Sequence, residues 1–125
     1  MNVKRRWRKL LVSLSAAIIV ATSTQITFAG DDKKLSLAEQ GKIIAYDRKK
    51  GNCLACHVIG DGEMPGNIAP PLMLMKARFP KKERLRAQIW DATVNNPYTA
   101  MPPFGRHKII SDQEIDAVVE FLYGL

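Results

Sequence analysis

Two cysteines and a histidine stand close together near the middle of the chain, at Cys53, Cys56 and His57. The spacing Cys-x-x-Cys-His offers two thiols that reach the vinyl groups on one porphyrin edge and an imidazole for its iron. A thioredoxin-like redox pair would need a βαβ pattern, and a zinc site would need two more ligands. The sequence offers neither, and these are its only two cysteines. We therefore predict one haem c, attached covalently through Cys53 and Cys56.

The iron of such a haem takes a second axial ligand, and the chain holds five methionines that could supply it. Met101 stands between Ala100 and two prolines, which hold the backbone extended and can aim the thioether at the iron. It also lies just before the last helical pattern, far enough along the chain to reach the opposite haem face. We predict His57 and Met101 as the metal ligands, a pair that raises the reduction potential.

The remaining candidates for the second ligand fit other roles better. Met64 lies only seven residues after His57 and is poorly placed to reach the opposite face. Met73 and Met75 fit apolar packing against the ring. His107 would give a bis-histidine haem, but its neighbours Arg106 and Lys108 are typical of a solvated loop.

An iron-bound imidazole donates its other ring proton to a fixed acceptor, which sets its tautomer and basicity. Pro70 is the candidate acceptor, because it offers a carbonyl oxygen and has no amide hydrogen of its own. We expect Trp90 and Tyr98 to pack against the haem edge, with contact to the propionates as the alternative.

Helical patterns flank these residues. A capping box at Ser36 predicts a helix over residues 37–49, and a second one at Ser111 predicts a helix to about Tyr123. Residues 81–92 also show helical spacing, whereas the prolines and glycines of residues 60–80 predict a wrapping loop. No segment alternates with period two. The prediction is an all-α fold of three to four helices with long loops around the haem.

Residues 1–29 have the features of a cleaved signal peptide: five basic residues within 1–9, then an apolar run of moderate length, then Thr27-Phe28-Ala29. The run is too short to span a bilayer, so we expect cleavage after Ala29, a domain over residues 30–125 and a periplasmic location. Cleavage leaves 14 basic and 12 acidic residues, a net charge of +2. We therefore expect no nucleic-acid partner, and no membrane span in the mature protein.

The mature chain resembles class I cytochromes c over nearly all its length, in the order of helix, Cys-x-x-Cys-His, proline loop, Met-Pro and final helix. Four blocks in order are similar to the SoxX family, the monohaem subunits of the sulfur-oxidation complex SoxAX: GNCLACH at 51–57, APPL at 69–72, RLRAQIWDA at 84–92 and MPPFGRH at 101–107. The resemblance implies a heterodimer with a SoxA-type subunit. Such a complex oxidatively joins thiosulfate to a cysteine of the SoxYZ carrier, and the electrons leave through SoxX to a downstream cytochrome or oxidase.

The cysteine count limits the share of this chain in that reaction. Forming a sulfur–sulfur bond by covalent catalysis needs a free thiolate, and both cysteines would be consumed as thioethers. We therefore expect no catalytic residue here and a role in electron relay. Two other functions stay open, a free-standing soluble electron shuttle and a ligand-sensing haem protein from which Met101 is easily displaced.

Overall fold

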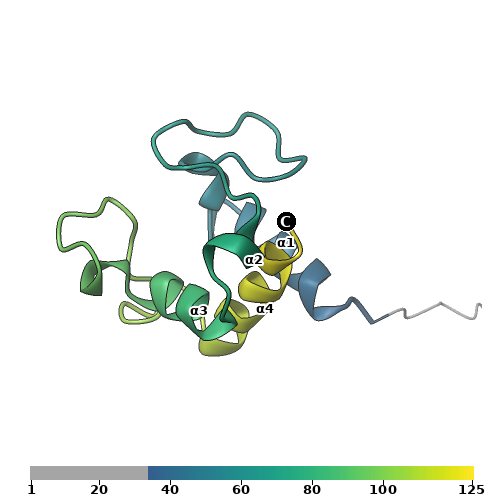
Figure 1. Cartoon of the computed structure of the whole chain (residues 1–125). Helices are drawn as coiled ribbons and strands as arrows, with labels where there is room; N and C mark the ends of the chain where they lie inside the picture. Colours follow the sequence, from purple (N-terminus) through teal and green to yellow (C-terminus); the bar gives the residue numbers. More distant parts are fainter. Residues whose placement is uncertain (1–33) are drawn as a thin grey trace, which may run out of the picture. The chain divides into compact units, whose positions relative to one another are not determined.

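The computed structural model describes residues 34–125, so the signal peptide expected over residues 1–29 lies outside the described residues. Within them the chain forms four α-helices and two short 3-10 helices (Figure 1). Their bounds in chain order are α1 Leu37–Tyr46, η1 Cys53–Ala55, α2 Met75–Arg78, α3 Lys82–Trp90, η2 Ala92–Val94 and α4 Asp112–Tyr123. Residues 34–125 contain no strand, and one isolated bridge joins Ile59 to Leu72. The all-α prediction is confirmed, and none of these helices is long and apolar enough to cross a membrane.

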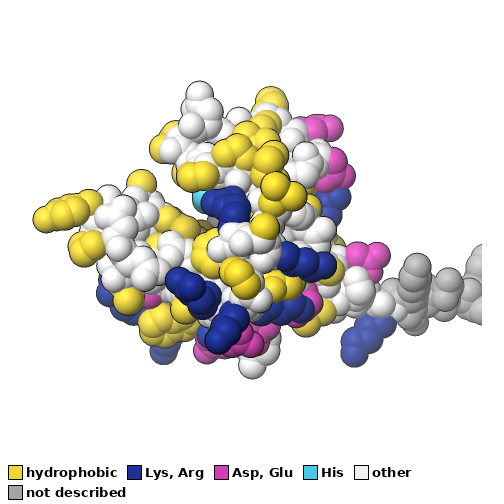
Figure 2. Space-filling model, viewed as in Figure 1, with side chains coloured by type: hydrophobic (Ala, Val, Ile, Leu, Met, Phe, Trp, Pro, Cys, Tyr) yellow, Lys and Arg dark blue, Asp and Glu magenta, His cyan; other side chains and the backbone are white. Residues whose placement is uncertain are grey.

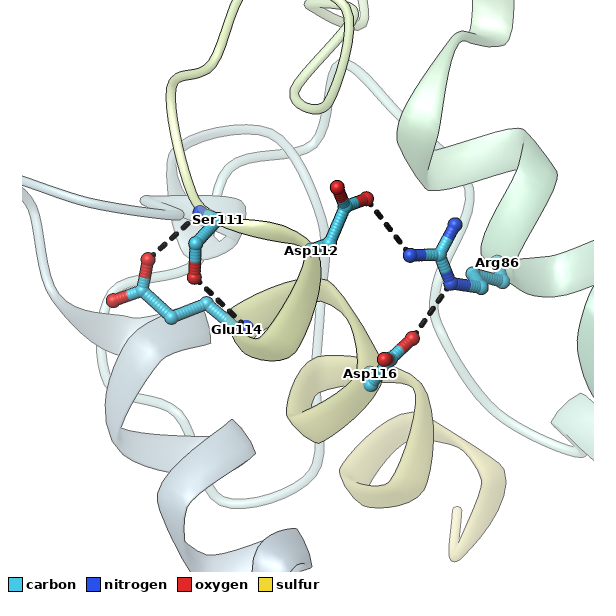
Figure 3. A network of polar contacts seen from close by, with 5 residues as sticks. All are labelled: Arg86, Ser111, Asp112, Glu114 and Asp116. Atoms are coloured by element: carbon cyan, nitrogen blue, oxygen red, sulfur yellow. Dashed lines mark hydrogen bonds and ion pairs between the residues drawn. The ribbon is translucent and has the colours of Figure 1, made fainter.

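Both predicted capping boxes are formed, and they start the two helices that pack most extensively together. At α1, Ser36 Oγ accepts the Glu39 N–H at 3.2 Å and the Glu39 carboxylate accepts the Ser36 N–H at 2.7 Å. Ser111 and Glu114 repeat this arrangement at α4 (Figure 3). These bonds satisfy N–H groups that have no partner inside the helix, so they fix where each helix begins.

Helices α1 and α4 pack face to face in the core, and Gly41 lies where their backbones approach closely. A Cβ at Gly41 would lie 1.9 Å from the Ala117 carbonyl oxygen, so the crossing admits only glycine. On α4, Ile115, Val118 and Leu122 are buried at the spacing that the sequence predicted.

Replacing Gly41 with alanine (Gly41→Ala) is expected to cost about 1–3 kcal/mol, because the helices must separate to admit the methyl group. The higher helix propensity of alanine returns about 1 kcal/mol, so the free energy of unfolding falls by up to about 2 kcal/mol. Chemical denaturation followed by circular dichroism measures the difference. The matched control is Gly124→Ala, where the nearest atom to a Cβ is Phe121 O at 3.3 Å. If both variants lost the same free energy of unfolding, the close approach of α1 and α4 at Gly41 would not be the cause of the loss.

Helix α1 is shorter than predicted, ending at Tyr46 and not at residue 49. The Asp47 carboxylate accepts the Lys49 N–H at 2.8 Å, which gives the backbone an alternative to the helix. The chain then turns back, and the Gly51 N–H donates to Ile44 O at 3.1 Å. A Cβ at Gly51 would lie 2.7 Å from that same oxygen, so the predicted glycine stop is a site of close backbone approach.

Helix α2 lies inside the segment predicted as loop throughout, and this part of the prediction is wrong. Leu74 precedes the helix with a φ of 52°, and the Met75 side chain is almost completely buried. Burial of this side chain holds one helical turn between the prolines. Arg78, at the end of α2, donates to Pro71 O at 2.7 Å and so ties the helix back to the loop.

Helix α3 lies against α4, with ion pairs along their exposed side. Arg86 donates to Asp112 at 2.8 Å and to Asp116 at 2.6 Å (Figure 3). The predicted helix over residues 81–92 ends earlier, at Trp90, because Asp91 is extended and its carboxylate accepts the Thr93 N–H at 3.0 Å. That carboxylate starts η2 in place of a further turn of α3.

Candidate haem site

A cavity of about 620 Å³ opens between η1, the proline loop, α3 and the segment before α4. This volume lies in the range of sites that hold cofactors or drug-sized ligands. The five residues predicted to attach the haem, to bind its metal or to accept from His57 all line it: Cys53, Cys56, His57, Pro70 and Met101. Its other lining side chains are largely apolar and come from four segments, among them Leu72, Met75, Phe79, Leu85, Ile89, Phe104, Ile110, Val118 and Leu122.

The two cysteines and His57 are arranged by the 3-10 turn η1. The Cys56 N–H and the His57 N–H both donate to Cys53 O, at 3.2 Å and 2.9 Å, so the five-residue motif folds into one compact turn. The two cysteines form no disulfide. Burial raises the pKa of the Cys53 thiol to about 11. A buried neutral thiol is the reverse of the low-pKa cysteine that a redox pair uses.

His57 meets Pro70 as the sequence predicted. His57 Nδ1 lies 2.7 Å from Pro70 O, and because a carbonyl oxygen only accepts, Nδ1 carries the proton and donates it. The other ring nitrogen, Nε2, then keeps its lone pair for a metal. Pro70 itself is held in place, because the adjacent Pro71 carbonyl accepts from Arg78.

The segment after His57 is tied to α1. The Tyr46 hydroxyl lies 3.0 Å from Ile59 O and 3.1 Å from an Asp61 carboxylate oxygen, and it donates its one hydrogen to these acceptors. Lys42 pairs with the same carboxylate at 2.7 Å. These contacts anchor the segment that follows the haem motif to α1.

Met101 reaches the same cavity from the other end of the chain. Its N–H donates to Thr99 Oγ1 at 3.1 Å, and Pro103 and Phe104, which follow it, are buried. Among the methionines of the described residues, Met75 also lines the cavity, but its sulfur accepts from Arg78 Nη1 at 3.6 Å.

The other candidates lie away from the cavity. Met64 is 83% exposed, and neither it nor His107 lines the cavity. Met73 is 55% exposed and does not line the cavity, whereas Met75 is buried and lines it, and their packing against the ring stays a prediction.

Trp90 and Tyr98 do not line the cavity either, and their expected packing against a haem edge stays a prediction. Tyr98 is 96% exposed. Trp90 packs against Gly105, where a Cβ would lie 2.0 Å from the indole.

Sequence reasoning missed the basic residues of this site. Arg48, Lys49, Lys50 and Arg78 all line the cavity. All four side chains are exposed, and Lys50 pairs with Glu114, so these positive charges lie on the solvent side of the cavity. The run of three basic residues just before the motif was the available signal.

The residues present fit a haem. A largely apolar cavity of suitable volume, two thiols on one turn and an imidazole with a free Nε2 are the features that covalent haem attachment requires. Together with the four helices and long loops, these features define a class I c-type cytochrome.

Comparisons with known proteins identify the family. Residues 31–122 match the family model described as "Cytochrome C oxidase, cbb3-type, subunit III", so the chain belongs to this cytochrome c family. The solved structure titled "Crystal structure of SoxXA from P. pantotrophus" is 33% identical, with a TM-score of 0.62, and the match covers 69% of this chain and 79% of that one. The chain is thus a SoxX-like cytochrome, whose cytochrome c domain carries covalently bound haem c. A search of curated proteins gave no match.

Proposed function

We propose that this chain is the monohaem electron-transfer subunit of a periplasmic SoxAX-type complex. In this proposal it forms a heterodimer with a SoxA-type subunit, and it accepts electrons released when thiosulfate is joined to a cysteine of a SoxYZ carrier. It passes them to a downstream cytochrome or oxidase. The likeness to the SoxXA structure supports the partner, and the cavity that gathers Cys53, Cys56, His57 and Met101 carries the electron-transfer role.

Each cavity residue has a role in this proposal. Cys53 and Cys56 would hold one haem through thioethers, and His57 Nε2 and the Met101 sulfur would be its metal ligands. Pro70 O keeps the proton on His57 Nδ1, which fixes the ring and raises its basicity. When bound, the haem supplies a one-electron couple that His/Met ligation places at a raised potential.

The sulfur chemistry then belongs to the partner. Joining a thiolate sulfur to thiosulfate forms one S–S bond and releases two electrons, which this subunit would accept one at a time. This chain has no cysteine beyond the two thioether positions, so it offers no thiolate to the substrate.

The surface beside the cavity supports a stable partner. Met64 and Ile68, on the loop after the haem motif, are 83% and 76% exposed. Val94 and Tyr98, near the Met101 segment, are 78% and 96% exposed. Figure 2 shows hydrophobic side chains on both sides of a hollow, with Lys and Arg side chains over α2 and α3 beside it. Hydrophobic side chains that gather on either side of a hollow, as in Figure 2, are typical of interaction sites.

Co-expression with a SoxA-type subunit tests the complex. We expect the two chains to co-purify and to elute together on gel filtration as a heterodimer. An unrelated periplasmic cytochrome co-expressed in place of the SoxA-type subunit is the control, and it should elute separately. Elution of this chain alone beside the SoxA-type subunit would overturn the complex and favour the free-standing shuttle.

A further inference from the structure

The segment that carries Met101 is a loop whose two ends meet. It leaves the core at Asp91, directly after α3, and returns at Arg106. The Gly105 N–H and the Arg106 N–H both donate to Trp90 O, at 3.0 Å and 3.3 Å. A Cβ at Gly105 would lie 2.0 Å from the Trp90 indole, so the two ends are in tight contact. Residues 91–106 therefore form a closed loop with a defined base.

A charged pair joins the ends of this loop. Asp91 Oδ2 lies 3.0 Å from Arg106 Nη1, and Asp91 is only 4% exposed. Its other oxygen accepts from the N–H and the hydroxyl of Thr93, at 3.0 Å and 2.5 Å. The pKa of Asp91 is held below its ordinary value, first by the Thr93 hydroxyl and further by Arg106 and His107. A buried carboxylate with these partners is charged and fixed in place.

Away from its base the loop has few ties to the rest of the domain, one of them the Asn95 amide, which donates to Gln88 Oε1 on α3 at 2.7 Å. Val94, Tyr98 and the residues between them are exposed. Within the described chain, the hydrogen bonds of residues 96–102 run to other residues of the loop, such as Tyr98 N–H to Asn96 and Met101 N–H to Thr99. Loops with exposed backbone and few buried contacts open most easily, so this one is kept closed by its base and by the buried Phe104 beside that base.

We propose that Asp91 and Arg106 are positioning residues that hold this loop closed and so keep the Met101 sulfur in the cavity. The inference rests on the proposed role of Met101 as the axial ligand. Neither residue lines the cavity, so both would act through the loop and not by touching the haem. Breaking the pair raises the fraction of molecules in which the loop is open and an external ligand can take the place of Met101.

The test is an imidazole titration of the oxidised holoprotein, followed by loss of the far-red methionine-to-iron absorption band. For Arg106→Gln we expect imidazole to bind about tenfold more tightly, because residues in direct contact couple by roughly that factor. Arg106→Lys keeps the charge and should restore most of the wild-type affinity. The matched control is Arg86→Gln, which removes the same charge from an arginine paired with Asp112 and Asp116 between α3 and α4.

Asp91→Asn gives an independent route if Arg106→Gln fails to fold. It removes the charge and leaves an oxygen for Thr93, and combined with Arg106→Gln it should weaken the loop little more than either change alone. The positioning role would be overturned if Arg106→Gln and Asp91→Asn both bound imidazole as the wild type does and both kept the far-red band. Met101 would then still be the ligand. Equal tightening in Arg86→Gln would also overturn the positioning role, as a general stability effect. Absence of the band from the wild type would overturn the ligand assignment itself, and the positioning role with it.

Discussion

The double substitution Cys53→Ser/Cys56→Ser is expected to leave no haem on the chain after denaturation. Both thioethers are removed, and the described residues contain no other cysteine. The cavity then has no covalent occupant, and its largely apolar lining meets water at a cost of several kcal/mol. That cost is comparable to the whole stability expected for a domain of this size. Haem staining of a denaturing gel measures attachment, and thermal unfolding measures the lost stability.

The single variants Cys53→Ser and Cys56→Ser serve as the controls. Each retains one thiol on the same turn, so each should keep part of the covalent haem at a reduced yield. Undiminished staining of the double variant would show that another side chain attaches the haem, and it would remove the main support for a c-type site.

The sequence predicted the parts of the fold that depend on local signals. Ser36 and Ser111 each start a helix through hydrogen bonds to a residue three positions further along the chain. The spacing of the apolar residues in α4 matches the side of the helix that is buried. Helix α2 was missed because Pro and Gly frequency says nothing about burial: Met75 is almost fully buried by contacts with residues far along the chain. The early end of α1 was missed for the opposite reason, since Asp47 offers a local competitor that periodicity does not reveal.

The candidate site was predictable where chemistry restricts the residue type. Few residue types can attach or bind a haem, and the chain has few of them, so Cys53, Cys56, His57 and Met101 could be selected by elimination. The expected packing of Trp90 and Tyr98 against the haem had no such restriction. An aromatic ring packs in many places, and Trp90 faces Gly105 because the two ends of the Met101 loop meet there. That closure depends on tertiary contacts that no local pattern shows.

Substituting alanine for Met101 (Met101→Ala) is expected to abolish the far-red methionine-to-iron band and to lower the reduction potential. A thioether favours reduced iron, whereas the water that would replace it favours oxidised iron. We expect the ratio of reduced to oxidised protein at a fixed ambient potential to fall at least tenfold, which corresponds to about 59 mV for one electron. Optical redox titration measures both changes in one experiment.

Two other methionines provide matched controls for Met101→Ala. Met64→Ala changes an exposed side chain and should leave the band, the potential and the stability as they are. Met75→Ala changes the other methionine that lines the cavity, and it should keep the band while losing about 2–5 kcal/mol of stability through the space it leaves. This pattern separates a metal ligand from a packing residue at the same cavity. A band that survives in Met101→Ala and disappears in Met75→Ala would move the ligand to α2, and the loop over residues 91–106 would then have no part in holding the metal.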